Sequence, residues 1–175
     1  MAWLTWLDSS WCLWGLNEFN SLSSEEAQRR LYACFASKKW ARRVAAGRPY
    51  ADVGTLLEAA EQAWSELAPS DWAEALAGHP RIGERGGSSP TASEREQGGL
   101  RKAPADTLAQ LAEENLRYEA RFGFVFLVSA AGRGADDILA EVRQRMRNDL
   151  VTEARVAAGE HRKIARLRLV ALVHG

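Results

Sequence analysis

The fold class of this chain depends on one apolar stretch, Arg121-Phe122-Gly123-Phe124-Val125-Phe126-Leu127-Val128. On composition, this stretch is compatible with a short buried strand. No other segment has a similar character, and none alternates between apolar and polar residues over the length of a strand. Because an isolated strand is not stable in water, the stretch is predicted to be an extended entry to a buried helix. The fold class is therefore predicted to be all-α.

Helical patterns flank this stretch on both sides. Ser23 and Glu26 have the spacing of a capping box and mark the start of one helix. Ser70 is the expected N-cap of a short helix that ends at Gly78. Apolar residues recur at three- and four-residue steps in segments 27–35, 41–46, 53–67, 70–77, 108–119, 135–150 and 151–173. We expect a single compact bundle of roughly seven to nine helices, in which Gly159 kinks or splits the last segment.

Length and charge narrow the class of protein. The chain has 175 residues, enough for one domain with its own core, and its 23 basic and 23 acidic residues balance. This balance excludes a whole-molecule basic surface for nucleic acid or an anionic membrane.

Two cysteines without metal-binding spacing argue against a disulfide scaffold or a zinc finger. The Trp-rich segment 1–15 is interrupted by Asp8 and lacks a signal-peptide pattern, so we treat it as an extension of unknown role before a domain at 16–175 and expect a cytoplasmic protein.

A long polar loop, residues 77–97, interrupts the helical patterns. Its helix-breaking residues are Gly78, Pro80, Gly83, Gly86, Gly87 and Pro90. Loops of this length are uncommon in compact domains unless they have a function. His79 can exchange protons near neutral pH, and Glu96 can orient it or share that work. Ser93 and Gln97 can hydrogen-bond a carbonyl, amide or carboxylate group. A solvated surface loop with one exposed histidine is the alternative.

Three further residues in the last helical segment carry polar or charged groups that could act in a site. Arg168 lies between Leu167 and Leu169, where a solvated arginine is less expected, and its guanidinium suits an anion or a urea-like edge. The alternative for Arg168 is an arginine at the edge of the core whose head reaches water. Glu160 and His161 are interpreted as a solvated pair, because a metal site needs several convergent ligands. No metal-binding spacing is present elsewhere.

Several spaced motifs together resemble the OHCU decarboxylase family. They are His79-Pro80-Arg81-Ile82-Gly83, Ser93-x-x-Glu96-Gln97, Asn115-x-x-Tyr118-x-x-Arg121-Phe122-Gly123-Phe124-x-Phe126 and Leu167-Arg168-Leu169. The resemblance runs from about Leu16 to the C-terminus and includes Arg48-Pro49-Tyr50. It implies an all-helical enzyme, commonly a homodimer, that decarboxylates 2-oxo-4-hydroxy-4-carboxy-5-ureidoimidazoline (OHCU) in uric acid degradation without a cofactor or metal.

The resemblance also implies roles for individual residues. His79 matches the family's catalytic histidine and Glu96 its essential glutamate. The matches for substrate binding are Pro80, Ser93, Gln97, Phe126, Val128 and Arg168. The contribution of Phe126 and Val128 is expected to come from the backbone of their segment, which lines the pocket.

Two alternative functions remain open on the sequence. The first is a helical protein-interaction module whose His79 loop is a binding epitope without turnover. The second is an enzyme of the same fold that acts on a different ureido acid. Substrate tests separate both alternatives from an OHCU decarboxylase.

Overall fold

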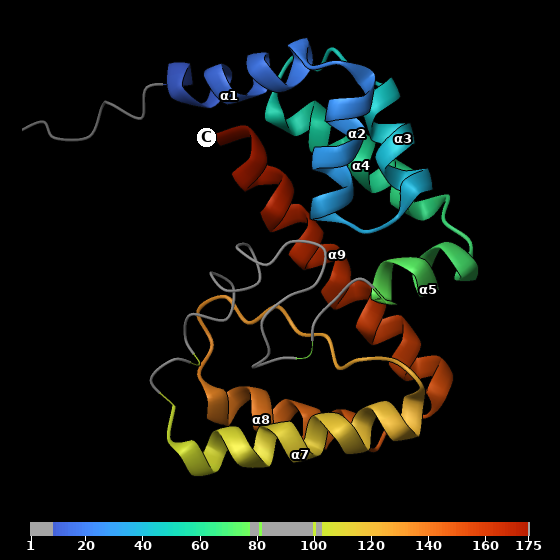
Figure 1. Ribbon diagram of the computed structural model, residues 1–175, viewed down its shortest axis with the longest axis vertical. Coiled ribbons are helices and arrows are strands. Elements are labelled where there is room, and N and C mark those ends of the chain that lie inside the picture. The colour runs from blue at the N-terminus through green and yellow to red at the C-terminus, as the bar shows by residue number, and fades with distance from the viewer. Residues whose placement is uncertain (1–8, 78–80, 82–99, 101–102, 175) are drawn as a thin grey trace, which may run out of the picture. The chain divides into compact units, whose positions relative to one another are not determined.

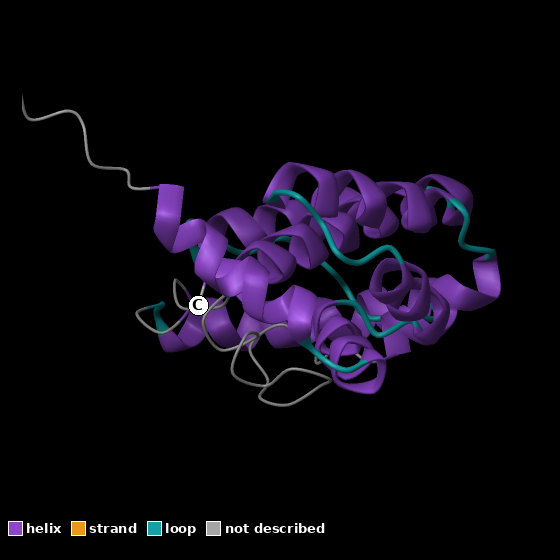
Figure 2. Cartoon of the chain, turned by 90° about the horizontal axis from the view of Figure 1, so that it is seen from above, coloured by secondary structure: helices purple, strands orange, loops and turns teal. Residues whose placement is uncertain are grey.

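The computed structural model describes residues 9–77, Arg81, Leu100 and residues 103–174. These residues form eight helices and no strand (Figure 2). The helices are α1 Ser9–Ser21, α2 Ser24–Cys34, α3 Lys38–Ala46, α4 Val53–Ser65, α5 Pro69–Ala77, α7 Ala105–Phe122, α8 Ala135–Arg145 and α9 Leu150–His174. The prediction of an all-α fold is confirmed.

The chain divides into two compact units. The first comprises Met1–Asp71 and Ala165–Gly175, and the second comprises Trp72–Ile164. The first therefore holds α1 to α4 and the C-terminal part of α9, whereas the second holds most of α5, α7, α8 and the N-terminal part of α9. The predicted boundary between an extension at 1–15 and a domain at 16–175 stays a prediction.

In the first unit, the connection between α3 and α4 holds the end of α1. The Arg48 guanidinium donates from Nη1 to the carbonyls of Phe19 at 2.9 Å and Leu22 at 2.8 Å. The Asn20 amide donates to the Tyr50 carbonyl at 2.8 Å and accepts from the Tyr50 N–H at 3.0 Å. Carbonyls at a helix C-terminus lack partners within the helix, and the Arg48 guanidinium supplies donors to two carbonyls at the end of α1. The turn expected at Arg48-Pro49-Tyr50 thus lies against the α1 terminus.

Gly15 of α1 approaches the main chain of α9 so closely that a methyl group would not fit. A Cβ atom at Gly15 would lie 2.2 Å from the Val173 carbonyl oxygen, whereas a Cβ at Gly159 meets no described atom within 4 Å. We expect Gly15→Ala to lower the free energy of unfolding by about 1–3 kcal/mol through overpacking. Gly159→Ala should raise it by about 0.5–1 kcal/mol, because alanine favours a helix interior. Urea unfolding of both variants checks this, and equal effects of the two substitutions would contradict it.

In the second unit, α7 and α8 pack side by side and run in the same direction. Thr107 near the start of α7 bonds Asp136 near the start of α8 at 3.2 Å, and Arg143 near the end of α8 bonds Glu114 farther along α7 at 3.0 Å. Gly123 ends α7 in the left-handed region, with φ of 81°. The chain then returns along the helix pair before α8 begins (Figure 1). The core of this unit includes Leu111, Tyr118, Phe122, Phe126, Ile138 and Val142.

Three local expectations were wrong. Ser70 is not an N-cap, because α5 begins at Pro69 and the Asp71 carboxylate accepts the N–H of Ala68 at 2.8 Å. Helix α8 ends at Arg145, and Asp149 starts a new helix by accepting the Thr152 N–H at 2.8 Å. Gly159 does not split α9, which is continuous from Leu150 to His174, and the alternative of a kink at Gly159 stays a prediction. Side-chain capping at Asp71 and Asp149 therefore outweighs the apolar periodicity in setting these boundaries.

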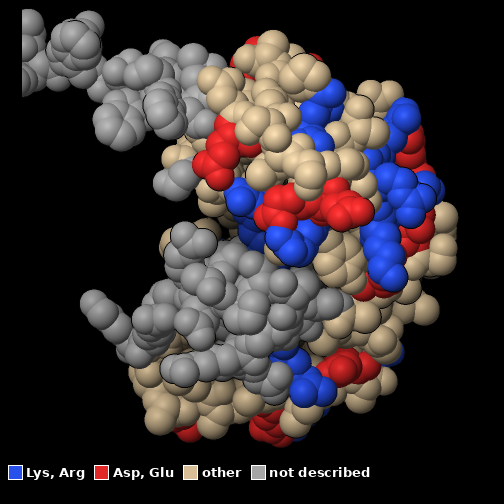
Figure 3. Space-filling view, turned by 45° about the horizontal axis from the view of Figure 1, so that its top comes forward, with Lys and Arg blue, Asp and Glu red and all other residues tan. Residues whose placement is uncertain are grey.

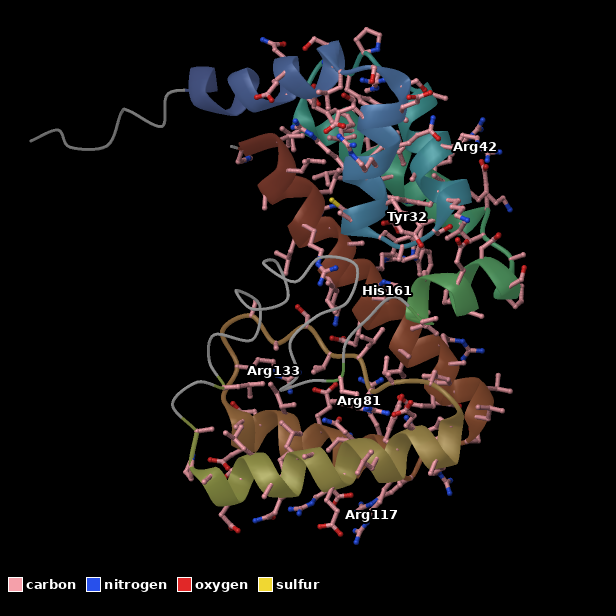
Figure 4. All side chains as sticks on the ribbon, viewed as in Figure 1. Tyr32, Arg42, Arg81, Arg117, Arg133 and His161 are labelled. Carbon is pink, nitrogen blue, oxygen red and sulfur yellow. The ribbon has the colours of Figure 1, made fainter. Side chains whose placement is uncertain are left out.

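Charges of both signs are mixed on the described surface. Figure 3 shows basic and acidic side chains next to one another on the face that it draws. Lys39 pairs with Asp71 at 3.1 Å and Arg117 with Glu113 at 2.6 Å. Figure 4 places Arg117 on the outer side of α7. This mixture agrees with the equal numbers of basic and acidic residues.

Candidate active site

The structure describes three of the eight residues that the sequence assigns to the site. Phe126 and Val128 belong to the second unit and Arg168 to the first. The others lie outside the described residues; they are His79, Pro80, Ser93, Glu96 and Gln97. The geometry of the site is therefore built from the extended segment between α7 and α8 and from Arg168 itself.

Phe126 and Val128 are buried in the extended segment that follows Gly123, at 2 % and 5 % exposure. The Phe126 ring packs edge-on against the Tyr118 ring, with centroids 5.1 Å apart. The Arg145 guanidinium lies over the Phe126 ring, 4.6 Å from the ring centroid. This packing fixes the ring of Phe126 in the core of the second unit, so a role for Phe126 in binding falls to its main chain.

The main chain of this segment is held by side chains from two helices. The Leu127 carbonyl accepts from Arg145 Nη1 at 2.7 Å, and the Ser129 N–H donates to Glu160 Oε2 at 2.8 Å. Among the described residues, no hydrogen bond uses the N–H or C=O of Phe126 or Val128. Buried main-chain polar groups are nearly always paired. Such groups can therefore bind the amide and carbonyl groups of a ligand.

Behind the segment lies a buried polar network centred on Glu153, which is 0 % exposed. Its carboxylate accepts from Arg145 Nε at 2.8 Å, from Asn148 at 2.7 Å and from the Tyr118 hydroxyl. Burial raises the pKa of Tyr118, and the adjacent Glu153 carboxylate raises it further. Burial alone would lower the pKa of Arg145, but its bonds to Glu153 and Tyr118 raise that pKa overall. Arg145 and Glu153 are thus a buried ion pair, and Tyr118 stays a neutral donor.

Glu160 was expected to be solvated, and this expectation was wrong. Its side chain is 12 % exposed and accepts from Lys163 at 2.6 Å as well as from Ser129. Burial raises the pKa of Glu160, but the bonds from Lys163 and Ser129 and the charge of Arg145 outweigh burial and lower it. The neighbouring His161 is also buried, at 3 % exposure, on α9 (Figure 4). Sequence reasoning missed Glu160 because its acceptor role depends on a residue 31 positions away.

Arg168 is buried at 6 % exposure, whereas Leu167 beside it is 46 % exposed. Its Nη1 lies 3.5 Å from the Ala33 carbonyl oxygen of α2. The alternative of an arginine whose head reaches water is therefore wrong. A buried charge is stable only when polar groups surround it, and the role of Arg168 in holding a polar ligand stays a prediction.

Arg81 extends the His79-Pro80 motif into the described structure. Its Nε donates to the Glu119 carboxylate of α7 at 2.7 Å, and Figure 4 shows it beside that helix. This ion pair links Arg81, the third residue of the motif, to α7. The sequence places Arg81 in the motif but does not indicate its role.

An open pocket of about 630 Å³ lies on the second unit, beside α8 and the start of α9. Of the site residues that the structure describes, neither Phe126, Val128 nor Arg168 lines it. Its basic groups are already paired, with Arg133 bonded to Glu141 at 2.5 Å and Arg145 to Glu153. The pocket therefore has no assigned role in the proposed reaction.

The described residues offer neither a metal site nor a membrane span. They contain no group of three histidine, cysteine, aspartate or glutamate side chains placed to hold a metal ion. None of the described helices is long and apolar enough to cross a membrane.

The sequence matches one protein family and is similar to several known proteins. The OHCU decarboxylase family matches residues 20–170. The 2-oxo-4-hydroxy-4-carboxy-5-ureidoimidazoline decarboxylase of Haloferax volcanii is 30 % identical over 160 residues, which cover 88 % of this chain and 93 % of that protein. A putative human protein of the same description is 34 % identical over 131 residues, 72 % of this chain and 76 % of its own. A uric acid degradation bifunctional protein of Arabidopsis thaliana is 30 % identical over 145 residues and 79 % of this chain, but this match spans only 45 % of the plant protein.

A solved structure agrees with the sequence matches. A crystal structure of OHCU decarboxylase in the presence of (S)-allantoin superposes with a TM-score of 0.73 at 28 % identity, over 84 % of this chain and 99 % of the other. A crystal structure of (S)-allantoin synthase has a TM-score of 0.67 at 18 % identity, over 90 % of this chain and 53 % of the other, and supports the fold alone. The family match covers most of the sequence and includes the motifs around His79, Glu96 and Arg168. The chain belongs to the OHCU decarboxylase family.

Proposed function

We propose that this chain catalyses the decarboxylation of 2-oxo-4-hydroxy-4-carboxy-5-ureidoimidazoline to (S)-allantoin in uric acid degradation. The observation that carries the proposal is the family match over residues 20–170, together with 30 % identity to the Haloferax protein over nearly its whole length. The solved OHCU decarboxylase with (S)-allantoin supports the product. The N–H and C=O of Val128, which make no hydrogen bond to another described residue, supply hydrogen-bonding capacity that suits a ureido ligand.

The reaction breaks one carbon–carbon bond and forms one carbon–hydrogen bond. The carboxylate leaves as carbon dioxide from a ring carbon that also bears a hydroxyl group. The bonding electron pair forms a double bond to the adjacent carbon of the C=N, and the C=N pair moves onto its nitrogen, which takes up a proton, so the substrate itself serves as the electron sink. The resulting enol loses its hydroxyl proton to give the carbonyl, while the neighbouring ring carbon is protonated on one face. The enzyme must therefore hold the substrate in one orientation and move protons.

The residues divide these tasks. His79 handles the proton on the hydroxyl or on the developing enolate, and Glu96 hydrogen-bonds the hydroxyl or the ureido group. Arg168 holds the carbonyl and ureido edge through its planar set of donors. Ser93 and Gln97 hydrogen-bond the remaining polar groups of the substrate. Pro80 and the main chain of Phe126 and Val128 complete the pocket. We further propose that the protein is a cytoplasmic homodimer.

The decay rate of OHCU tests this proposal against its rivals. OHCU decays spontaneously to racemic allantoin, so the protein contributes rate and handedness. We expect catalytic amounts of the protein to accelerate the loss of OHCU absorbance well above the spontaneous rate. A binding module would leave that rate unchanged. An enzyme for a different ureido acid would also leave it unchanged but would turn over another ureido acid.

A further inference from the structure

Two charged side chains, the buried Arg145 and the partly buried Glu160, hold the main chain on either side of Val128. Arg145 of α8 holds the Leu127 carbonyl at 2.7 Å, and Glu160 of α9 holds the Ser129 N–H at 2.8 Å. We propose that Arg145 and Glu160 are positioning residues, which hold the N–H and C=O of Val128 in the orientation that binds the substrate. This inference rests on the proposed function, because it assigns the two residues to the same reaction.

The spacing of the two bonds determines which groups remain available. In an extended chain, alternate residues direct their N–H and C=O groups to the same side. Leu127 and Ser129 are two residues apart, so the two bonds occupy one side of the segment. The polar groups of Val128 face the other side. Both bonds thus hold one edge and leave the opposite edge for a ligand.

Each holding group is itself fixed in place. The Arg145 guanidinium donates from Nε to the Glu153 carboxylate at 2.8 Å and lies over the Phe126 ring at 4.6 Å. Glu160 is paired with Lys163 at 2.6 Å. Charge-assisted hydrogen bonds are shorter and stronger than neutral ones. The position of the Val128 main chain is therefore set by two helices and not by the segment alone.

A purely structural role for Arg145 and Glu160 does not explain the main chain of Val128. A buried segment outside helices and sheets must have its main-chain groups paired by side chains, and Arg145 and Glu160 do so for Leu127 and Ser129. Val128 is just as buried, at 5 % exposure, yet within the described chain its N–H and C=O have no such bond. Pairing on both sides of an unpaired residue indicates that the unpaired groups are kept for a ligand.

Substitutions at Glu160 test the inference with a conservative variant and a matched control. Glu160→Ala removes the acceptor for Ser129, whereas Glu160→Gln keeps an acceptor oxygen in the same place. Arg143→Ala is the control, because it removes a bond of 3.0 Å between α8 and Glu114 of α7 without touching the segment. The readouts are kcat and KM for OHCU, thermal unfolding, and hydrogen exchange of the Ser129 amide measured by NMR. Kinetics are measured well below the unfolding temperature of each variant.

We expect Glu160→Ala to lower kcat/KM by roughly tenfold to a hundredfold, because a displacement of about 1 Å in a binding group has an effect of this size. The same substitution should speed hydrogen exchange of the Ser129 amide. Glu160→Gln should recover most of the activity, and Arg143→Ala should lower thermal stability with kcat/KM within about threefold of the unchanged chain. If Glu160→Ala lowers only the unfolding temperature, or leaves the Ser129 amide protected, the inference is wrong. If the unchanged chain does not decarboxylate OHCU, the proposed function fails first, and the exchange data then decide separately whether Glu160 holds Ser129.

Discussion

Replacement of His79 by asparagine should lower kcat for OHCU by about a hundredfold to ten-thousandfold, which is the usual contribution of a positioned general acid or base. Asparagine keeps hydrogen-bonding groups of similar reach but does not titrate near neutral pH. Substrate binding through Arg168, Ser93 and Gln97 would remain, so KM should change much less than kcat. Steady-state kinetics on purified protein measure both parameters.

His174→Asn is the matched control for this substitution. His174 is exposed in the last turn of α9, and its replacement makes the same chemical change away from the motifs. We expect kcat of His174→Asn to match that of the unchanged protein. A His79→Asn protein with more than about a tenth of the original kcat would show that His79 is not the proton-handling group.

Removal of Glu153 should be the most destabilising single change in the second unit. Glu153→Ala leaves the buried Arg145 charge with the longer contact to Glu141 at 3.3 Å in place of its short pair with Glu153, and leaves the Tyr118 hydroxyl and Asn148 without their acceptor. Breaking a buried ion pair from one side costs about 3–5 kcal/mol. We expect the free energy of unfolding to fall by that amount. Denaturant unfolding followed by far-ultraviolet circular dichroism measures it.

Glu113→Ala provides the comparison for an exposed ion pair. Glu113 pairs with Arg117 at 2.6 Å, and both side chains are about 60 % exposed. Such pairs contribute about 0–1 kcal/mol. A second variant, Glu153→Leu combined with Arg145→Met, removes both charges and should be more stable than Glu153→Ala. If Glu153→Ala costs no more than Glu113→Ala, the Glu153 network does not hold the unit together.

The all-α fold class was predictable because the sequence has only one stretch with the composition of a strand. The stretch from Arg121 to Val128 has the composition of a strand, but no second stretch exists to pair with it. In the structure, the first two residues end α7 and the rest form an extended segment, held by Arg145 and Glu160. A sequence shows that a strand partner is absent. It does not show which distant side chains take the partner's place.

Capping was predictable only where the pattern is local and complete. Ser23 caps α2 as its spacing with Glu26 indicates, and its hydroxyl accepts the Glu26 N–H. At α5 and α9, the sequence offers several serines and aspartates close to one another, and periodicity alone does not choose between them. Asp71 and Asp149 act as the capping groups there. These boundaries depend on which carboxylate reaches a main-chain N–H.

Parts of the candidate site were predictable from motif order, but its supporting residues were not. The burial of Arg168 agrees with its unusual position between two leucines. Glu153 and Glu160, in contrast, look like ordinary surface carboxylates in a charged helix. Their burial follows from Arg145, Tyr118 and Ser129, which lie between 8 and 35 positions away in the chain. Such contacts are properties of the tertiary structure.

Circular dichroism of allantoin formation is the most direct test of whether this chain is an OHCU decarboxylase. Urate is oxidised in the presence of urate oxidase and hydroxyisourate hydrolase, with and without this protein, and the signal of the product is followed in time. We expect rapid growth of an (S)-allantoin signal that is absent without the protein and lost with His79→Asn. A racemic product formed at the spontaneous rate, from protein shown to be folded, would contradict the assignment of this chain as an OHCU decarboxylase.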